Sequence, residues 1–242
     1  MINYNKSINS NNFDKKLRKL SQIKYIIVHY TGMQSEVEAI KRLLDPKFKV
    51  SCHFLVNKKG RIIKMVPERF ISWHAGKSKW KKLKSLNKFS IGIELTNPGH
   101  SFGDKKFPKK QMLSLIKLLK FLIKKYKIPR SNILGHSDIA PLRKKDPGEK
   151  FPWESLSKIN IGMWHNFNKN YLKKNRKIII SKKEKIAFFK FLKKIGYQTH
   201  FDCKKPFYEK KLIKAFQRRF RPELISGNID KECLLISKNI AF

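Results

Sequence analysis

The stretch Asn132–Trp153 reads NILGHSDIAPLRKKDPGEKFPW and organises the rest of this 242-residue chain. A short apolar run ends at Gly135-His136, and the loop that follows gathers carboxylates, cations and prolines. Prolines restrict the backbone, so a loop of this composition is stiff. Loops at the ends of strands commonly carry the functional groups of a rigid scaffold. We therefore predict that His136 and carboxylates of this loop form part of a site.

A second histidine occupies the same kind of position far upstream. Residues 25–31 read YIIVHYT, so His29 closes a β-branched run that is typical of a buried strand. Open α/β sheets build their sites at strand ends, and we predict that His29 and His136 meet there around one metal ion. A catalytic zinc site takes three protein ligands and leaves a position open, and Asp146 would be the third ligand.

Asp138 is the alternative third ligand in the same loop. It follows His136 closely in the sequence, and we interpret it as a cap or as a partner that orients a ligand imidazole. Glu149 is expected to be a solvated loop charge.

The patterns that surround this loop predict an α/β domain, with a mixed β-sheet flanked by helices. Strands are expected at residues 23–30, 50–56, 61–66, 89–96 and 133–136, and amphipathic helices at 36–44 and 108–127. Glu94 lies inside one of these strands, on a side where Gly92 and Thr96 are small and leave room above it. Residues 71–80, ISWHAGKSKW, show no period and suit a groove wall, so Trp73, His74 and Trp80 are candidate groove residues.

The ends of the chain differ from this domain in composition. Residues 1–21 are polar and rich in Asn and Lys, which predicts a flexible leader before a catalytic domain at 22–164. Residues 165–180 are expected to be a linker or a peripheral strand. Helical patterns at 182–195, 208–220 and 230–237 then predict a small three-helix domain over 181–242.

The charge of the chain is strongly positive, with 57 Lys and Arg against 17 Asp and Glu and a formal net charge of +40. This excess favours an anionic partner, such as nucleic acid, acidic lipid or a cell-wall polymer. The codon bias of an AT-rich genome would also produce it. The lysines are spread along the whole chain, which argues against a specific nucleic-acid interface. No apolar window is long enough for a transmembrane helix.

The cysteines and the N-terminal residues give information on the cellular compartment of the protein. Cys52, Cys203 and Cys233 show no metal-type spacing, and their odd number argues against a full disulfide framework, although a Cys203–Cys233 pair stays open. The first residues contain no apolar core of an ordinary signal peptide. The cytoplasm and the periplasm both stay open as compartments, and so does the oligomeric state.

Four motifs now stand in a fixed order along the chain: IIVHYTG, SWHAGKSKW, SIGIELTNPG and the 132–153 loop. Together they resemble the zinc-dependent N-acetylmuramoyl-L-alanine amidases, most closely the AmiD-like branch of the type-2 amidase family, over roughly residues 22–160. That family is related in fold to peptidoglycan recognition proteins and to the phage T7 lysozyme. Residues 181–242 resemble the three-helix peptidoglycan-binding domain of the same branch.

The resemblance implies a role for each chemical residue. It implies that His29, His136 and Asp146 are the zinc ligands, that Glu94 is the acid/base acting on the attacking water, and that Lys144 helps to stabilise the oxyanion. The expected reaction is hydrolysis of the amide between N-acetylmuramic acid, or its anhydro form, and L-alanine of the stem peptide. Peptidoglycan or a muropeptide would be the partner, in bacterial cell-wall turnover or recycling.

Contacts with the substrate are expected from Tyr30, Trp73 and His74. The alternative is a non-catalytic peptidoglycan-recognition module, which would be expected to lack a zinc ligand or Glu94, and this chain has all of them. A prophage endolysin would use the same chemistry in another biological role.

Overall fold

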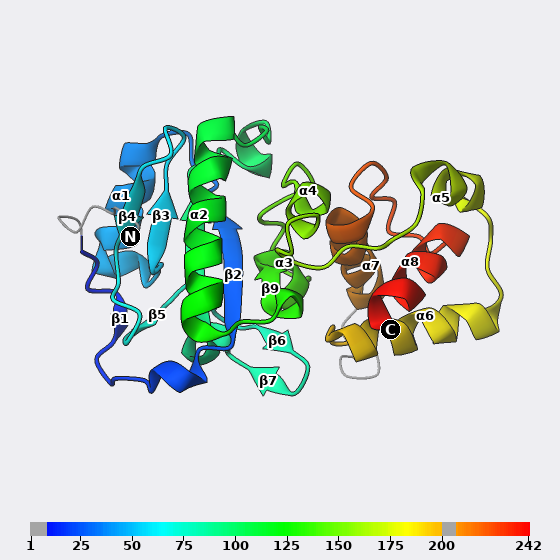
Figure 1. Cartoon of the computed structure of the whole chain (residues 1–242), viewed down its shortest axis with the longest axis horizontal. Helices are drawn as coiled ribbons and strands as arrows, with labels where there is room; N and C mark the ends of the chain where they lie inside the picture. The colour runs from blue at the N-terminus through cyan, green and yellow to red at the C-terminus, as the bar shows by residue number, and fades with distance from the viewer. Residues whose placement is uncertain (1–8, 200–206) are drawn as a thin grey trace.

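The structure is a computed structural model that describes residues 9–199 and 207–242 (Figure 1). The strands are β1 Phe13–Asp14, β2 Tyr25–Tyr30, β3 Phe54–Val56, β4 Ile62–Lys64, β5 Ile71–Ser72, β6 Lys79–Trp80, β7 Leu83–Lys84, β8 Ser90–Leu95 and β9 Ile133–Gly135. The α-helices are α1 Glu36–Leu44, α2 Lys109–Tyr126, α3 His136–Ile139, α4 Trp153–Ser157, α5 Lys169–Asn175, α6 Lys182–Ile195, α7 Tyr208–Phe220 and α8 Lys231–Ala241. Among the described residues, none of these helices combines the length and apolarity needed to cross a bilayer.

The main sheet has the strand order β4-β3-β8-β2-β9. Strands β3, β8, β2 and β9 are parallel to their neighbours, and β4 returns antiparallel to β3. The pairs β1–β5 and β6–β7 form small separate ribbons. The mixed sheet flanked by helices, predicted from the alternating patterns, is confirmed.

Strand alternation assigns each face of the sheet to a different partner. Ile26 and Val28 of β2 pack in one cluster with the leucines of α2, which lies across this face (Figure 1). Tyr25 and Ile27 point to the opposite face and pack against the C-terminal helices. Since His29 continues the second set, its imidazole lies on the face away from α2.

The N-terminal segment departs from the prediction. Phe13–Asp14 pairs with β5, and the side chains of Asn12 and Arg18 are buried. The Asn12 amide donates to the carbonyl oxygens of Leu43, Asp45 and Val50, at 3.0–3.2 Å. Polar groups can be buried where each one finds a partner. The expectation of a flexible leader is therefore wrong for residues 9–21.

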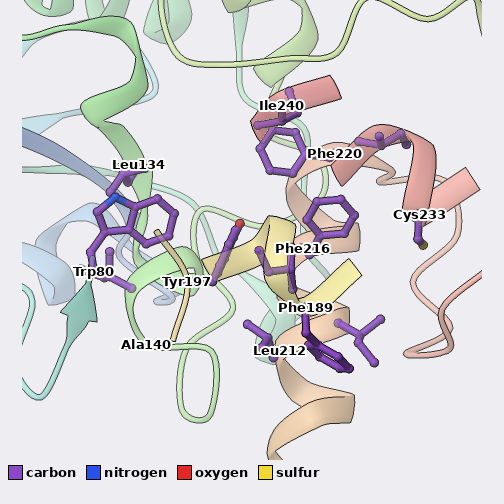
Figure 2. Packing of buried hydrophobic residues seen from close by; sticks show 14 of the residues in the cluster. Trp80, Leu134, Ala140, Phe189, Tyr197, Leu212, Phe216, Phe220, Cys233 and Ile240 are labelled. Carbon is purple, nitrogen blue, oxygen red and sulfur yellow. The ribbon is translucent and has the colours of Figure 1, made fainter. Parts of the chain in front are cut away.

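The C-terminal helices pack against the domain that precedes them (Figures 1 and 2). Helices α6, α7 and α8 form where the sequence predicts them, and α8 extends further to Ala241. Their buried side chains share one cluster with residues of the sheet and its loops, including Trp80, Leu134 and Ala140. The predicted linker contains α5, whose Leu172 joins the same cluster. The helices and the sheet thus have a common core on this side.

Trp80 and two of the cysteines are buried in the structure. Trp80 is only 2% exposed and packs edge-on against Tyr197, with ring centroids 4.8 Å apart, so it is a core residue and its assignment to a groove is wrong. Cys52 and Cys233 are free and buried. The possible partner Cys203 lies outside the described residues.

Candidate active site

The proposed site lies at the carboxyl ends of three neighbouring strands. His29 is next to last in β2, and its register partner in β8 is Glu94. On the other side of β2, strand β9 ends at Gly135 and His136 follows as the first residue of α3. Parallel strands direct all these ends to one edge of the sheet, which is where open α/β sheets place ligands.

Three side-chain atoms meet at this edge. His29 Nδ1 lies 2.9 Å from His136 Nδ1 and 3.0 Å from Asp146 Oδ2, and His136 Nδ1 lies 3.1 Å from the same carboxylate oxygen. All three residues are at most 5% exposed. The two histidines are 107 positions apart in the sequence, and the pairing of β2 with β9 brings them together.

A neutral imidazole carries its proton on one of its two ring nitrogens. The Nε2 atoms of His136 and His29 point away from Asp146 and contact other groups. His136 Nε2 lies 3.1 Å from the Ala75 carbonyl oxygen, and donation to this oxygen would leave Nδ1 with its lone pair. The Arg143 guanidinium donates to the same carbonyl oxygen. Arg143 Nη2 also lies 3.2 Å from His136 Nε2, but a carbonyl oxygen only accepts, so we assign the proton of His136 to Nε2.

A chain of hydrogen bonds fixes the tautomer of His29 in the same way. Ser90 Oγ donates to the Leu86 carbonyl oxygen at 2.7 Å, so it accepts from His74 Nε2 at 3.1 Å. His74 Nδ1 is then the acceptor for His29 Nε2 at 3.0 Å. His29 Nδ1 therefore faces His136 and Asp146 with its lone pair.

Burial and charge set the protonation states of His29 and Asp146. Burial, followed by the neighbouring His136, lowers the pKa of His29 to about 4, so its imidazole is neutral at physiological pH. Burial alone would raise the pKa of Asp146, but charge attraction and hydrogen bonds from His136 and His29 in their protonated forms hold that pKa well below its usual range. Two lone pairs and a carboxylate that face one another attract a cation.

These donors fit a zinc ion. Nitrogen and carboxylate ligands bind zinc at about 2.0–2.2 Å, which puts neighbouring ligand atoms roughly 3.3 Å apart, close to the separations seen here. Partners that hold the outer nitrogens of ligand histidines are also typical of metal sites.

His100, Asp104 and Glu149 form another cluster whose donor atoms lie within 4.8 Å of one another. Glu149 accepts from His100 Nε2 at 2.9 Å, so it is not the solvated charge expected from the sequence.

Glu94 lies beside the three ligands with an unusual carboxyl group. Its Oε2 is buried and has no hydrogen-bond partner among the described residues. Burial, helped by the negative charge of Asp146, raises the pKa of Glu94 to about 8. A carboxyl group with a raised pKa in a hollow is a candidate acid/base. Lys144 opposes this rise, so its cation is close enough to act on the same charge.

A cavity of about 340 Å³ opens over these groups. Its wall includes the three ligand residues, Glu94, Lys144 and all three predicted substrate contacts, Tyr30, Trp73 and His74. The Tyr30 hydroxyl hydrogen-bonds with His100 Nδ1 at 2.8 Å. The Trp73 indole donates to Asp14 at 2.7 Å, so the N-terminal segment also shapes this wall.

Comparison with known proteins decides the family. A sequence model of the N-acetylmuramoyl-L-alanine amidase domain matches residues 19–149. The amidase AmiD of Escherichia coli is 36% identical over 229 residues, covering 90% of this chain and 82% of that protein. The chain belongs to the N-acetylmuramoyl-L-alanine amidase family. AmpD of Haemophilus influenzae is 34% identical to this amidase over 167 residues, covering 62% of this chain and 88% of its own length.

Solved structures agree with this family. The structure of E. coli AmiD superposes on the amidase with a TM-score of 0.80 at 33% identity, covering 94% of this chain and 91% of the other. AMPDH3 of Pseudomonas aeruginosa gives a TM-score of 0.79 at 27% identity, covering 99% and 97%. The fold similarity therefore extends over the C-terminal helices as well as the sheet.

Several residues of the site carried no signal in the sequence. Ser90 contacts His74, the Ala75 carbonyl faces His136 Nε2, and Arg42 of α1 lines the cavity. Both ring nitrogens of His74 are engaged inside the amidase, one with His29 and one with Ser90. Asp138 is the predicted cap, since it accepts from the Gly135 N–H at 2.8 Å.

Proposed function

We propose that this amidase holds a zinc ion between His29, His136 and Asp146 and hydrolyses the amide that joins N-acetylmuramic acid, or its anhydro form, to L-alanine. The observation that carries the proposal is the triangle of two lone pairs and one carboxylate oxygen, all within 3.1 Å of one another. A cation between its members offsets their mutual repulsion.

Glu94 is the general acid/base in this proposal. Zinc, when bound, would polarise the carbonyl and lower the pKa of a water molecule to about 7. Glu94 has a free buried oxygen on the cavity wall that can take the proton of the attacking water. The same carboxyl group then passes this proton to the leaving amine, which must be protonated to depart.

Lys144 is the proposed donor to the oxyanion. Attack on the amide carbon places negative charge on the carbonyl oxygen, and a positioned cation lowers the energy of that state. Lys144 lies on the cavity wall, two positions before Asp146 in the same loop. Its ammonium group would therefore reach the cavity from the side of the metal ligands.

Relatives support a muropeptide with an anhydro sugar as substrate. AmpD of H. influenzae is named a 1,6-anhydro-N-acetylmuramyl-L-alanine amidase. The structure of E. coli AmiD contains anhydro-N-acetylmuramic acid-L-Ala-D-gamma-Glu-L-Lys as substrate. We infer the same class of substrate for this chain, in cell-wall recycling.

The C-terminal helices are proposed to contact peptidoglycan. A hollow of about 1100 Å³ lies between the segment before α6, the start of α7 and the loop before α8. Its lining is apolar at Ile178, Ile213 and Ile229. The charged lining residues are four lysines (Lys177, Lys182, Lys185 and Lys210) and two acids (Glu209 and Asp230). Lysines beside an apolar floor suit a stem peptide that carries carboxylates.

Removing the metal tests the proposal. Dialysis against a strong chelator should abolish cleavage of an anhydro-muropeptide, and stoichiometric zinc should restore it. Mass spectrometry of the products would identify the bond, because cleavage at the proposed amide releases the free stem peptide. Full activity in metal-free protein, or cleavage at another bond, would contradict the proposal.

A further inference from the structure

The C-terminal helices reach the loop that carries two of the proposed zinc ligands. The guanidinium of Arg219, on α7, pairs with Asp138 at 3.4 Å and donates to the Ile133 carbonyl oxygen at 3.2 Å. The same guanidinium lies 3.3 Å from the centre of the Trp153 ring. Ile133 and Trp153 stand at the two ends of the loop, so one side chain bridges its base.

A second residue of the helical part binds the same carboxylate. Tyr197 lies just after the end of α6, and its hydroxyl donates to Asp138 Oδ1 at 2.6 Å. Tyr197 is held in place by the shared core, where its ring packs against Trp80 (Figure 2). Asp138 is 2% exposed and Arg219 is 3% exposed, so water contributes little to either group.

Asp138 passes this restraint to the ligands. Its Oδ2 accepts from the N–H of Gly135, the residue before His136, and thereby caps α3. One residue further on, the Ser137 N–H donates to the backbone oxygen of Asp146 at 2.9 Å. The start of α3 therefore sets the position of both ligands of the loop.

We propose that Arg219 and Tyr197 are positioning residues of the amidase, through which the C-terminal helices hold His136 and Asp146 in the geometry that binds the metal. This inference rests on the proposed zinc site. Neither residue lines the catalytic cavity, so their effect passes through Asp138. The C-terminal helices thus take part in the active site in addition to any contact with the wall.

Arg221 provides a matched control. It lies two positions further along the chain, is as buried as Arg219, and forms ion pairs with Asp230 and Glu232. These partners belong to the C-terminal helices and the loop before α8. Arg219→Gln and Arg221→Gln each remove one buried guanidinium from the same helical part, but only the first removes contacts with the catalytic loop.

The test measures the loop and the metal separately, in the full-length chain. In metal-free protein, Arg219→Gln should speed amide hydrogen exchange at Gly135 and Ser137 by about tenfold or more, because these amides open locally when Asp138 is released. In competition with a chromophoric chelator, the same variant should bind zinc about 10–100-fold more weakly, as is usual when partners of metal ligands are lost. Arg221→Gln should lower the melting temperature while exchange and zinc affinity stay within about twofold of the parent.

Equal effects of the two variants on exchange and zinc affinity would overturn the inference, because both would then reflect general destabilisation. Tyr197→Phe removes one hydroxyl and keeps the ring, so it serves if Arg219→Gln does not fold. It should change exchange and zinc affinity in the same direction, and parental values for both would overturn the inference. A parent protein that binds no zinc would contradict the proposed metal site, while the exchange measurement would still decide on the positioning role.

Discussion

Glu94 shows how a single residue can be poor for stability and useful for chemistry. One oxygen of its carboxyl group is buried and has no partner in the described part of the chain, and its pKa is raised to about 8. Burying an acid without a partner costs free energy when the acid ionises. Such costs are common at active sites, where they keep a group ready for proton transfer.

Replacing Glu94 by Gln should separate these two effects. The pKa of Glu94 in the folded, metal-free protein, about 8, exceeds the usual value of 4.5, so ionisation opposes folding. The stability that its protonated form provides is complete below pH 4.5 and is lost as the pH rises to 8. Glu94→Gln should therefore raise the melting temperature of metal-free protein at pH 8 but not at pH 4.5, while turnover of zinc-loaded enzyme falls about 10²–10⁴-fold. Turnover within a few-fold of the parent would place the acid/base elsewhere.

Lys144 can be tested against its own neighbour. Lys144→Ala should lower kcat about 10²–10³-fold with little change in zinc content, since a donor to the oxyanion acts in the transition state. Lys145→Ala removes the same charge one position further on, and this residue is not part of the cavity wall. Its kcat should stay within about twofold of the parent. Similar losses in the two variants would indicate a general effect of charge.

Strand β8 illustrates how an element prepares the site around it. A glycine at position 92 leaves a gap in the sheet surface, and the His74 imidazole fills this gap on its way to His29. A Cβ at Gly92 would come within 2.3 Å of the ring of His74. The absence of a side chain at Gly92 is thus needed to make room for His74, which contacts the proposed ligand His29.

The variant Gly92→Ala should displace His74. We expect it to lower stability by about 1–3 kcal/mol, as overpacked cores do, and to weaken zinc binding because His29 loses its partner. Gly103→Ala is the control, because a Cβ there meets no atom within 4 Å and only the backbone conformation at φ +85° resists the change. Calorimetry and chelator competition would measure both effects. Parental zinc affinity in Gly92→Ala would show that His74 does not act through His29.

The positive charge of the protein extends well beyond the catalytic cavity. The formal net charge is +40, and most lysines lie outside the catalytic cavity. A field of this size attracts anionic surfaces over about one Debye length, roughly 8–10 Å at physiological ionic strength. The sheet and the C-terminal helices share one core, so the charged surface and the site belong to one body.

Salt should therefore affect large and small substrates differently. Raising NaCl from about 50 to 500 mM should weaken binding to intact sacculi several-fold, because an extended anionic wall interacts with many lysines at once. Cleavage of a soluble muropeptide should change by less than about twofold. Parallel assays on the two substrates, with products measured by mass spectrometry, would show this. Equal salt dependence would mean that the surface charge has no role in wall binding.

Much of the site could be predicted because its signals are local in the sequence. Runs of β-branched and aromatic residues identify β2 and β8, their ends carry His29 and Glu94, and the order of the motifs resembles one enzyme family. The capped helix 36–44 and the three C-terminal helices follow from the same kind of pattern. Periodicity states which side of an element is apolar, and this information is complete within a few turns of chain.

Only the tertiary structure decides which polar groups meet across long distances. Arg219 and Asp138 are 81 positions apart, and the order of the segment 9–21 depends on acceptors in loops far along the chain. A buried arginine or asparagine has the same local pattern as a solvated one, because its stability depends on partners that the neighbouring sequence does not contain. The amino-acid sequence by itself thus determines the strands, the helices and the types of the proposed ligands, whereas three-dimensional packing determines which side chains hold them in place.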